Sequence, residues 1–106
     1  MAVMERIRAE LEAHPVVLYM KGTPEVPMCG YSKRAVEALR AAGAERLHTV
    51  NVMADPEIRA NLPRYADWPS FPQLYVQGEL IGGADIVVEL AEAGELARIV
   101  AEAQAS

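Results

Sequence analysis

The chain has 106 residues, of which 52% are hydrophobic and 24% are charged, and its formal net charge is -5. This size and composition predict one soluble globular domain spanning residues 1–106, with a core large enough to fold without disulfides. The negative charge argues against nucleic acid as a partner, because phosphate binding requires clustered Lys and Arg side chains. No apolar run approaches the roughly 20 residues of a membrane span, so no membrane partner is expected.

The first half of the chain alternates between helical and strand patterns. Val3, Ile7 and Leu11 fall on one helical face, and Pro15 ends that pattern. The apolar run that follows has no alternation, which is typical of a strand buried on both faces. A second helical face ends at Gly43, a residue suited to a helix C-cap. The predicted elements are a helix over residues 2–13, a strand over 16–20, a helix over 32–42 and a strand over 47–52.

The second half begins with a strong helix start and continues through a hairpin. Asp55 can cap a helix whose first residue is Pro56, because an acidic cap and a proline at the first position both favour helix initiation. Prolines punctuate the loop over residues 68–72, and Gln77-Gly78 suits a tight hairpin turn. The predicted elements are a helix from 56 to about 65, strands over 73–76 and 79–81, and helical faces at 86–90 and 96–100.

The order of these elements predicts an α/β fold. Strands joined by helices are expected to run parallel through right-handed crossovers, and the hairpin adds an antiparallel edge. The expected architecture is a mixed four-stranded sheet with helices on both faces, which is the outline of the thioredoxin fold.

Cys29 is the only cysteine in the chain, so it can form neither an intramolecular disulfide nor a metal site with several thiolates from one chain. Such a residue is by default a small buried hydrophobe. Pro27 and Gly30, however, mark a turn just before the helix predicted from Ser32, and unsatisfied N–H groups at a helix N-terminus favour the thiolate. A function built on Cys29 must therefore take a second thiol from another molecule. A single cysteine with no signal peptide also predicts a cytoplasmic protein.

Four motifs, in this order and spacing, resemble those of the monothiol glutaredoxins, and the resemblance covers almost the whole chain. Three positions depart from the usual family pattern: Tyr31 replaces Phe, Ser70 replaces Thr, and Ala84 stands where many members carry a second cysteine. Tyr at position 31 also occurs in dithiol glutaredoxins, whereas the lengthened loop before Cys29 favours the cluster-carrying monothiol class. The motifs are Lys21-Gly22-Thr23-Pro24, Cys29-Gly30-Tyr31-Ser32, the run over residues 68–76 and the run over residues 78–85.

The resemblance implies that glutathione supplies the missing thiol. Glutathione has a carboxylate at each end and an amine beside one of them. Lys21 and Arg59 are implied partners of its glycyl carboxylate, as cations that can reach it. Backbone N–H groups of Ala84 and Asp85, at a predicted helix start, are implied to hold the γ-glutamyl carboxylate, while the Asp85 side chain accepts from the amine.

Further roles around the thiol are implied by the same resemblance. Phe71-Pro72 matches the family's cis-proline step, which would turn the Phe71 backbone toward the cysteinyl part of glutathione. Gly83 belongs to the implied glutathione site. Gly30 would let the backbone approach a metal cluster closely, and Tyr31 would shield one side of it.

The resemblance also implies a [2Fe–2S] cluster, which is commonly held by four thiolates. Cys29 as metal ligand and one bound glutathione supply half of this set, so two chains and two glutathiones predict a cluster-bridged homodimer. Such a carrier would pass its cluster to iron–sulfur apoproteins.

Two alternatives stay open at this point. Cys29 could be the catalytic thiol of a glutathione-dependent oxidoreductase, which attacks a protein–glutathione mixed disulfide and is regenerated by a second glutathione. The chain could also be an adaptor that docks another protein, such as the BolA-type partner that the resemblance suggests.

Overall fold

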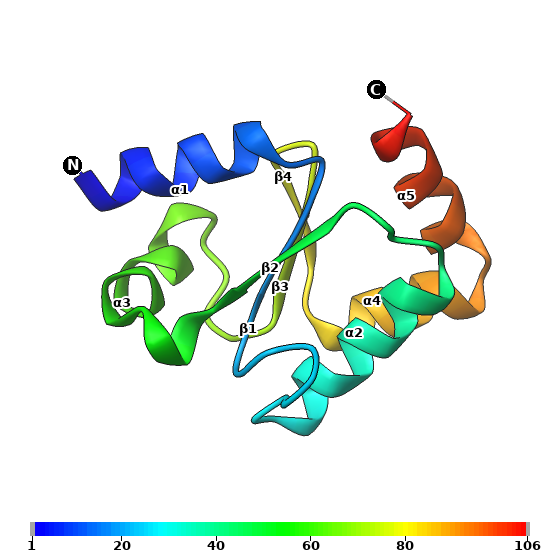
Figure 1. The fold of residues 1–106 in the computed structure, drawn as a ribbon, viewed down its shortest axis with the longest axis horizontal. Coiled ribbons are helices and arrows are strands. Elements are labelled where there is room, and N and C mark those ends of the chain that lie inside the picture. Colours follow the sequence, from blue (N-terminus) through cyan, green and yellow to red (C-terminus); the bar gives the residue numbers. More distant parts are fainter. Residues whose placement is uncertain (1, 106) are drawn as a thin grey trace.

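The computed structural model describes residues 2–105 and has one mixed sheet between two layers of helices (Figure 1). The strand order is β2-β1-β3-β4, so β1 lies inside the sheet. The predicted fold class is confirmed. The strands are β1 (Val16–Met20), β2 (Leu47–Asn51), β3 (Gln73–Val76) and β4 (Glu79–Gly82).

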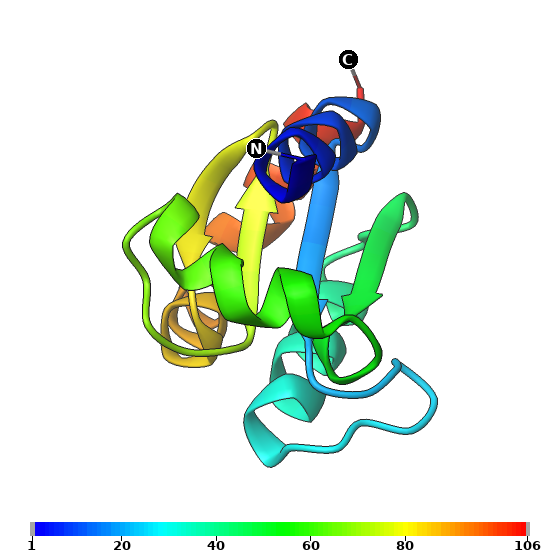
Figure 2. The same cartoon turned by 90° about the vertical axis from the view of Figure 1, so that its left-hand side faces the viewer.

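Two groups of helices cover the faces of the sheet. On one face lie α1 (Ala2–Ala13) and α3 (Pro56–Tyr65), which stand in front of the strands in Figure 2. None of the helices described within residues 2–105 is both long and apolar enough to cross a bilayer. The opposite face is covered by α2 (Gly30–Ala41), α4 (Ala84–Glu92) and α5 (Glu95–Gln104).

Strand β1 joins the two cores because successive side chains of a strand point to opposite faces. Val16, Leu18 and Met20 pack toward α2, α4 and α5, whereas Val17 and Tyr19 pack toward α1 and α3. All these side chains are buried, as the apolar run predicts.

The direction of β3 differs from the expectation. Strands β1 and β2 are parallel, but β3 runs antiparallel to β1, with Gln73 opposite Tyr19. The loop over residues 66–72 carries the chain back to the edge of the sheet where β2 ended (Figure 2). The helix between β2 and β3 is therefore not part of a parallel crossover, and the prediction for this pair of strands was wrong.

Local capping explains two element boundaries. The Asp55 carboxylate accepts a hydrogen bond of 3.2 Å from the Ile58 N–H, which confirms the predicted cap of α3. Strand β2 ends at Asn51, one residue before the predicted end. The Asn51 side chain accepts from the Met53 N–H at 2.9 Å and caps a short 3₁₀ turn, η1 (Val52–Ala54).

The end of α5 is held against the turn that precedes β2. The Gln104 side chain accepts a hydrogen bond of 2.7 Å from the Arg46 N–H and donates one of 3.0 Å to the Gly43 carbonyl. This contact lies at the edge of the sheet where β1 and β2 begin, which is the edge remote from Cys29 (Figure 1).

The loop between β1 and α2 folds back on itself. Met28 N–H donates to the Lys21 carbonyl at 2.9 Å, and Thr23 and Val26 exchange two backbone hydrogen bonds of 3.1 Å. Gly22 allows this approach because its φ of +90° lies in the left-handed region, where side chains are disfavoured. The loop therefore places Cys29 at a fixed point beside the end of β1.

We expect Gly22→Ala to destabilise the protein more than Gly43→Ala. Both glycines have positive φ, but a Cβ at Gly22 would lie 2.5 Å from the Val26 carbonyl oxygen, whereas a Cβ at Gly43 meets nothing within 4 Å. The strained φ alone should cost about 1 kcal/mol at Gly43, and the added clash should bring the loss at Gly22 to roughly 2–4 kcal/mol. Urea unfolding measures both; equal losses would contradict the tight closure of the loop.

Candidate functional site

Cys29 occupies the N-cap position of α2, with an extended backbone (φ -158°, ψ 135°). Its side chain is partly exposed, which excludes the role of a buried hydrophobe. The Ser32 backbone N–H lowers the pKa of the Cys29 thiol, with smaller contributions from the Tyr31 N–H and the Lys21 charge, while partial burial opposes them. The structure thus supports the expected preference for the thiolate.

Ser32 has a structural role that the sequence analysis missed. Its hydroxyl is buried and accepts a hydrogen bond of 3.1 Å from the Lys21 N–H. The Asn51 side chain adds a second link, because it accepts from the Gly22 N–H at 2.9 Å. A serine inside the apolar face of a helix signals such a role, since a buried hydroxyl requires a partner.

A groove of about 380 Å³ lies next to this helix start. Its walls come from the first turn of α2, the loop before β3 and the first turn of α4. The Phe71-Pro72 peptide bond is cis, as expected, and the Phe71 backbone makes no hydrogen bond with the rest of residues 2–105. The lining residues are Tyr31, Trp68, Ser70, Phe71, Pro72, Gly83, Ala84, Asp85 and Ile86.

Trp68 forms part of the groove wall. Its indole Nε1 is buried and has no hydrogen-bond partner among the described residues. Gly83 lies against the indole, because a Cβ at that position would be in van der Waals contact with this nitrogen at 3.4 Å. A buried indole N–H usually finds an acceptor, so this nitrogen is available to a molecule bound in the groove.

A second depression, of about 550 Å³, opens beside the thiol and shares Tyr31 with the groove. Tyr31 therefore stands between Cys29 and the start of α4. Lys33 and Arg34 bring positive charge to this depression, and the sequence analysis singled out neither. The lining residues are Cys29, Gly30, Tyr31, Lys33, Arg34 and Glu37.

Lys21 and Arg59 lie outside both depressions. Lys21 is half-buried after the end of β1, and Arg59 is exposed on α3 in a separate hollow beside Met53. Within residues 2–105, neither side chain makes an ion pair or a hydrogen bond. Both cations are therefore free to meet an external anion, but the structure does not bring Arg59 into the groove.

Apolar side chains are exposed around the thiol. Val26 is 68% exposed, Met28 62% and Tyr31 56%, and Met53 on η1 is 38% exposed. Exposed apolar residues that gather near a reactive group indicate a contact surface.

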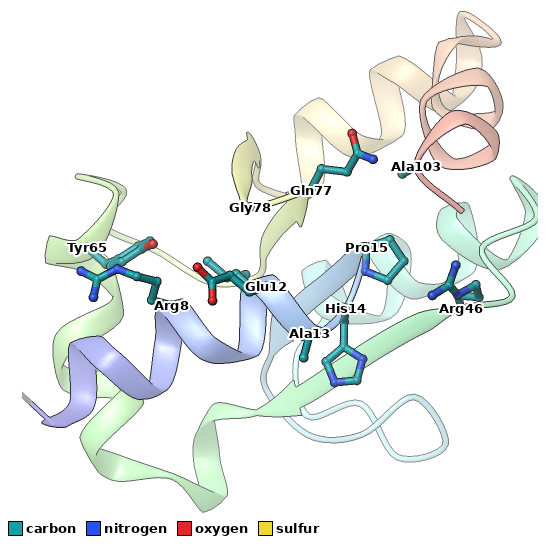
Figure 3. Close-up of a pocket in the computed structure, with 11 residues that line it drawn as sticks. Arg8, Glu12, Ala13, His14, Pro15, Arg46, Tyr65, Gln77, Gly78 and Ala103 are labelled. Atoms are coloured by element: carbon teal, nitrogen blue, oxygen red, sulfur yellow. The ribbon is translucent and has the colours of Figure 1, made fainter. Parts of the chain in front are cut away.

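A pocket of about 580 Å³ lies at the other end of the molecule and contains no residue of the predicted site. It is formed where α1 leads into β1, next to the β3–β4 turn (Figure 3). Arg8 and Arg46 lie at its two ends, with Glu12 and His14 between them. Because Cys29 follows the opposite end of β1, this pocket cannot serve chemistry at the thiol.

The match to known proteins agrees with the site. Residues 16–81 match the family model described as Glutaredoxin. The chain is 50% identical over 102 residues to Glutaredoxin 4 of Escherichia coli (strain K12), which covers 96% of this chain and 88% of that protein. The chain belongs to the monothiol glutaredoxin family. Glutaredoxin 4 of Haemophilus influenzae (strain 86-028NP) is 47% identical over 105 residues, covering 99% of this chain and 97% of that protein.

Solved glutaredoxin structures share the fold. The solution structure of reduced poplar apo GrxS14 superposes with a TM-score of 0.84 at 39% identity and covers 100% of both chains. A monomeric truncated mutant of Trypanosoma brucei 1-C-Grx1 has a TM-score of 0.83 at 36% identity, covering 93% of this chain and 89% of that one. The thioredoxin-type sheet with its flanking helices is therefore the fold of this monothiol glutaredoxin.

Because the pKa of Cys29 is lowered, we expect its alkylation rate to rise at a lower pH than that of an ordinary cysteine. Because the thiolate is the nucleophile, the rate with iodoacetamide should increase with pH, with a midpoint below the value of about 8.5 for an ordinary cysteine. Lys21→Gln should raise this midpoint by removing a favourable charge, whereas Lys33→Gln serves as a control in the same region. A midpoint at or above the ordinary value would contradict the stabilisation of the thiolate.

Proposed function

We propose that this monothiol glutaredoxin binds glutathione in the groove beside Cys29 and carries a [2Fe–2S] cluster between two subunits. The observation that carries the proposal is a lone, accessible thiol of lowered pKa at the start of α2, next to that groove. Cys29 supplies one thiolate, so a metal site with several thiolate ligands needs a thiol from a second molecule. A redox cycle that passes through a disulfide of Cys29 needs one as well.

Glutathione fits the polar groups that the groove leaves available. The free Phe71 backbone can pair with the cysteinyl residue as a short added strand. The start of α4 at Ala84 and Asp85 offers backbone N–H groups to the γ-glutamyl carboxylate. Gly83 lines the same groove and has no side chain to occupy it. Lys21 and Arg59 would meet the glycyl carboxylate from outside the groove.

The cluster is the cargo of this proposal. No group of three or more His, Cys, Asp or Glu side chains within residues 2–105 is arranged to hold a metal ion, so further ligands must come from outside the chain. Cys29 and a glutathione thiol from each of two subunits would complete the set. Gly30 lines the thiol depression together with Cys29, and a Cβ there would meet nothing within 4 Å beyond its two chain neighbours.

The same thiol supports a second candidate function, deglutathionylation. The Cys29 thiolate would attack the glutathione sulfur of a protein–glutathione disulfide and release the protein thiolate. A second glutathione thiolate would then attack the new disulfide, which yields oxidised glutathione and regenerates Cys29. The lowered pKa of Cys29 favours this route, and no second cysteine is required.

Partners and location extend the proposal. The exposed side chains of Val26, Met28 and Tyr31 provide apolar contact area for a second copy, for a BolA-type protein or for iron–sulfur apoproteins that receive the cluster. These exchanges would take place in the reducing cytoplasm, where a lone thiol stays reduced.

Anaerobic reconstitution with iron, sulfide and glutathione tests the carrier function. The wild-type protein should show a [2Fe–2S] absorption spectrum and elute as a dimer, and both should disappear when glutathione is omitted. Cys29→Ser should lose the cluster while its unfolding free energy changes by less than about 1 kcal/mol, because the side chain is partly exposed and makes no capping hydrogen bond.

Three outcomes separate the candidates. A cluster retained by Cys29→Ser would refute the ligand assignment. A colourless monomer that turns over a glutathione mixed disulfide would establish the oxidoreductase instead. A protein with neither property would refute both functions.

Tyr31→Phe tests the departure from the usual family motif. The Tyr31 hydroxyl makes no hydrogen bond within residues 2–105, and its ring lies between the thiol depression and the groove. Removing this polar group should strengthen cluster retention, measured as slower decay of the cluster absorbance in air. An unchanged decay rate would mean that the hydroxyl is neutral.

A further inference from the structure

Arg34 lies one turn into α2, and its guanidinium connects two walls of the groove. Its Cζ atom lies 5.2 Å from the centre of the Tyr31 ring, and its Nη2 atom lies 3.8 Å from Asp85 Oδ1. Helices α2 and α4 pack against each other (Figure 1). Asp85 lines the groove and Arg34 lines the neighbouring thiol depression, so a cation and an anion stand side by side where the two hollows meet.

This ion pair is suited to exchange with a ligand. The side chains of Arg34 and Asp85 are 54% and 83% exposed, so water competes strongly with their attraction. The Tyr31 ring restrains the guanidinium through a cation–π contact, which keeps the positive charge near the groove even when Asp85 turns to another partner.

We propose that Arg34 binds the carboxylate of the γ-glutamyl end of glutathione while Asp85 binds the ammonium group on the same carbon. The inference rests on the proposed function and adds a specificity-determining residue to it. Asp85 alone would attract the ammonium group but repel the adjacent carboxylate. The Arg34 guanidinium offsets this repulsion and presents paired N–H donors that match a carboxylate.

A zwitterionic amino-acid end is thus recognised by a matched pair of opposite charges. When a ligand lacks the γ-glutamyl residue, Arg34 and Asp85 stay paired with each other. Neither residue then contributes to the binding free energy of that ligand. Arg34 should therefore affect the binding of glutathione but not of N-acetyl-cysteinylglycine, which keeps the thiol and the glycyl carboxylate and lacks both γ-glutamyl charges.

Chemical-shift titrations of reduced protein with these two ligands test the assignment. Arg34→Gln should weaken glutathione binding by roughly three- to tenfold, as expected for the loss of one exposed charge-assisted contact, and should leave N-acetyl-cysteinylglycine binding unchanged. Arg34→Lys should recover part of the loss. Arg40→Gln is the matched control, because Arg40 is exposed on the same helix but pairs with Glu25 at 3.4 Å and lines neither the groove nor the thiol depression.

The outcomes distinguish this inference from the proposed function. Equal weakening of both ligands, no change, or the same loss in Arg40→Gln would each overturn the role of Arg34. Tighter glutathione binding by Arg34→Gln would also overturn it, because Arg34 would then compete with the ammonium group for Asp85. If glutathione fails to bind the unaltered protein, the proposed function itself falls, and the role of Arg34 with it.

Discussion

The hydrogen bond from the Lys21 N–H to the buried Ser32 hydroxyl ties the end of β1 to the first turn of α2. Together with the Met28–Lys21 backbone bond, it closes the intervening loop and leaves Cys29 at the helix start. The thiol owes its lowered pKa to N–H groups of that same turn. Without this link between strand and helix, the sulfur would lose both its position beside the groove and its electrostatic stabilisation.

The thiol lies among positively charged side chains, although the chain as a whole is negatively charged. The protein carries a formal net charge of -5, yet the cations Lys21, Lys33 and Arg34 lie near Cys29, where Glu37 is the acidic residue in the lining of the thiol depression. A local positive field of this kind attracts anionic thiols and disfavours wholly cationic peptides, even on an acidic protein. The exposed apolar side chains of Val26 and Met28 then give a bound molecule contact area that charge alone does not provide.

Most of the fold could be predicted from the sequence because its signals are local. The buried run of β1, the Asp55 cap and the β3–β4 hairpin each depend on a few neighbouring residues. The direction of β3 could not be predicted in this way, because it depends on the path of the loop over residues 66–72 relative to a strand far away in the sequence.

In the candidate site, too, residues with a local signal could be predicted, whereas residues placed by contacts between distant segments could not. Motif residues around the thiol and the cis-proline could be picked out through the resemblance to the monothiol glutaredoxins. Trp68 and Arg34 could not, because their places depend on contacts between elements: the indole against Gly83, and the guanidinium against Tyr31 and Asp85. Helix pattern alone does not say which side chain reaches across to a neighbouring helix.

Gln104 anchors the last helix at the edge of the sheet remote from Cys29. A fluorescent label, an immobilising linker or a second protein fused behind α5 would consequently project away from the reactive end. The molecule can therefore be tethered by its tail in single-molecule or surface experiments and still offer its sulfur to whatever approaches from solution.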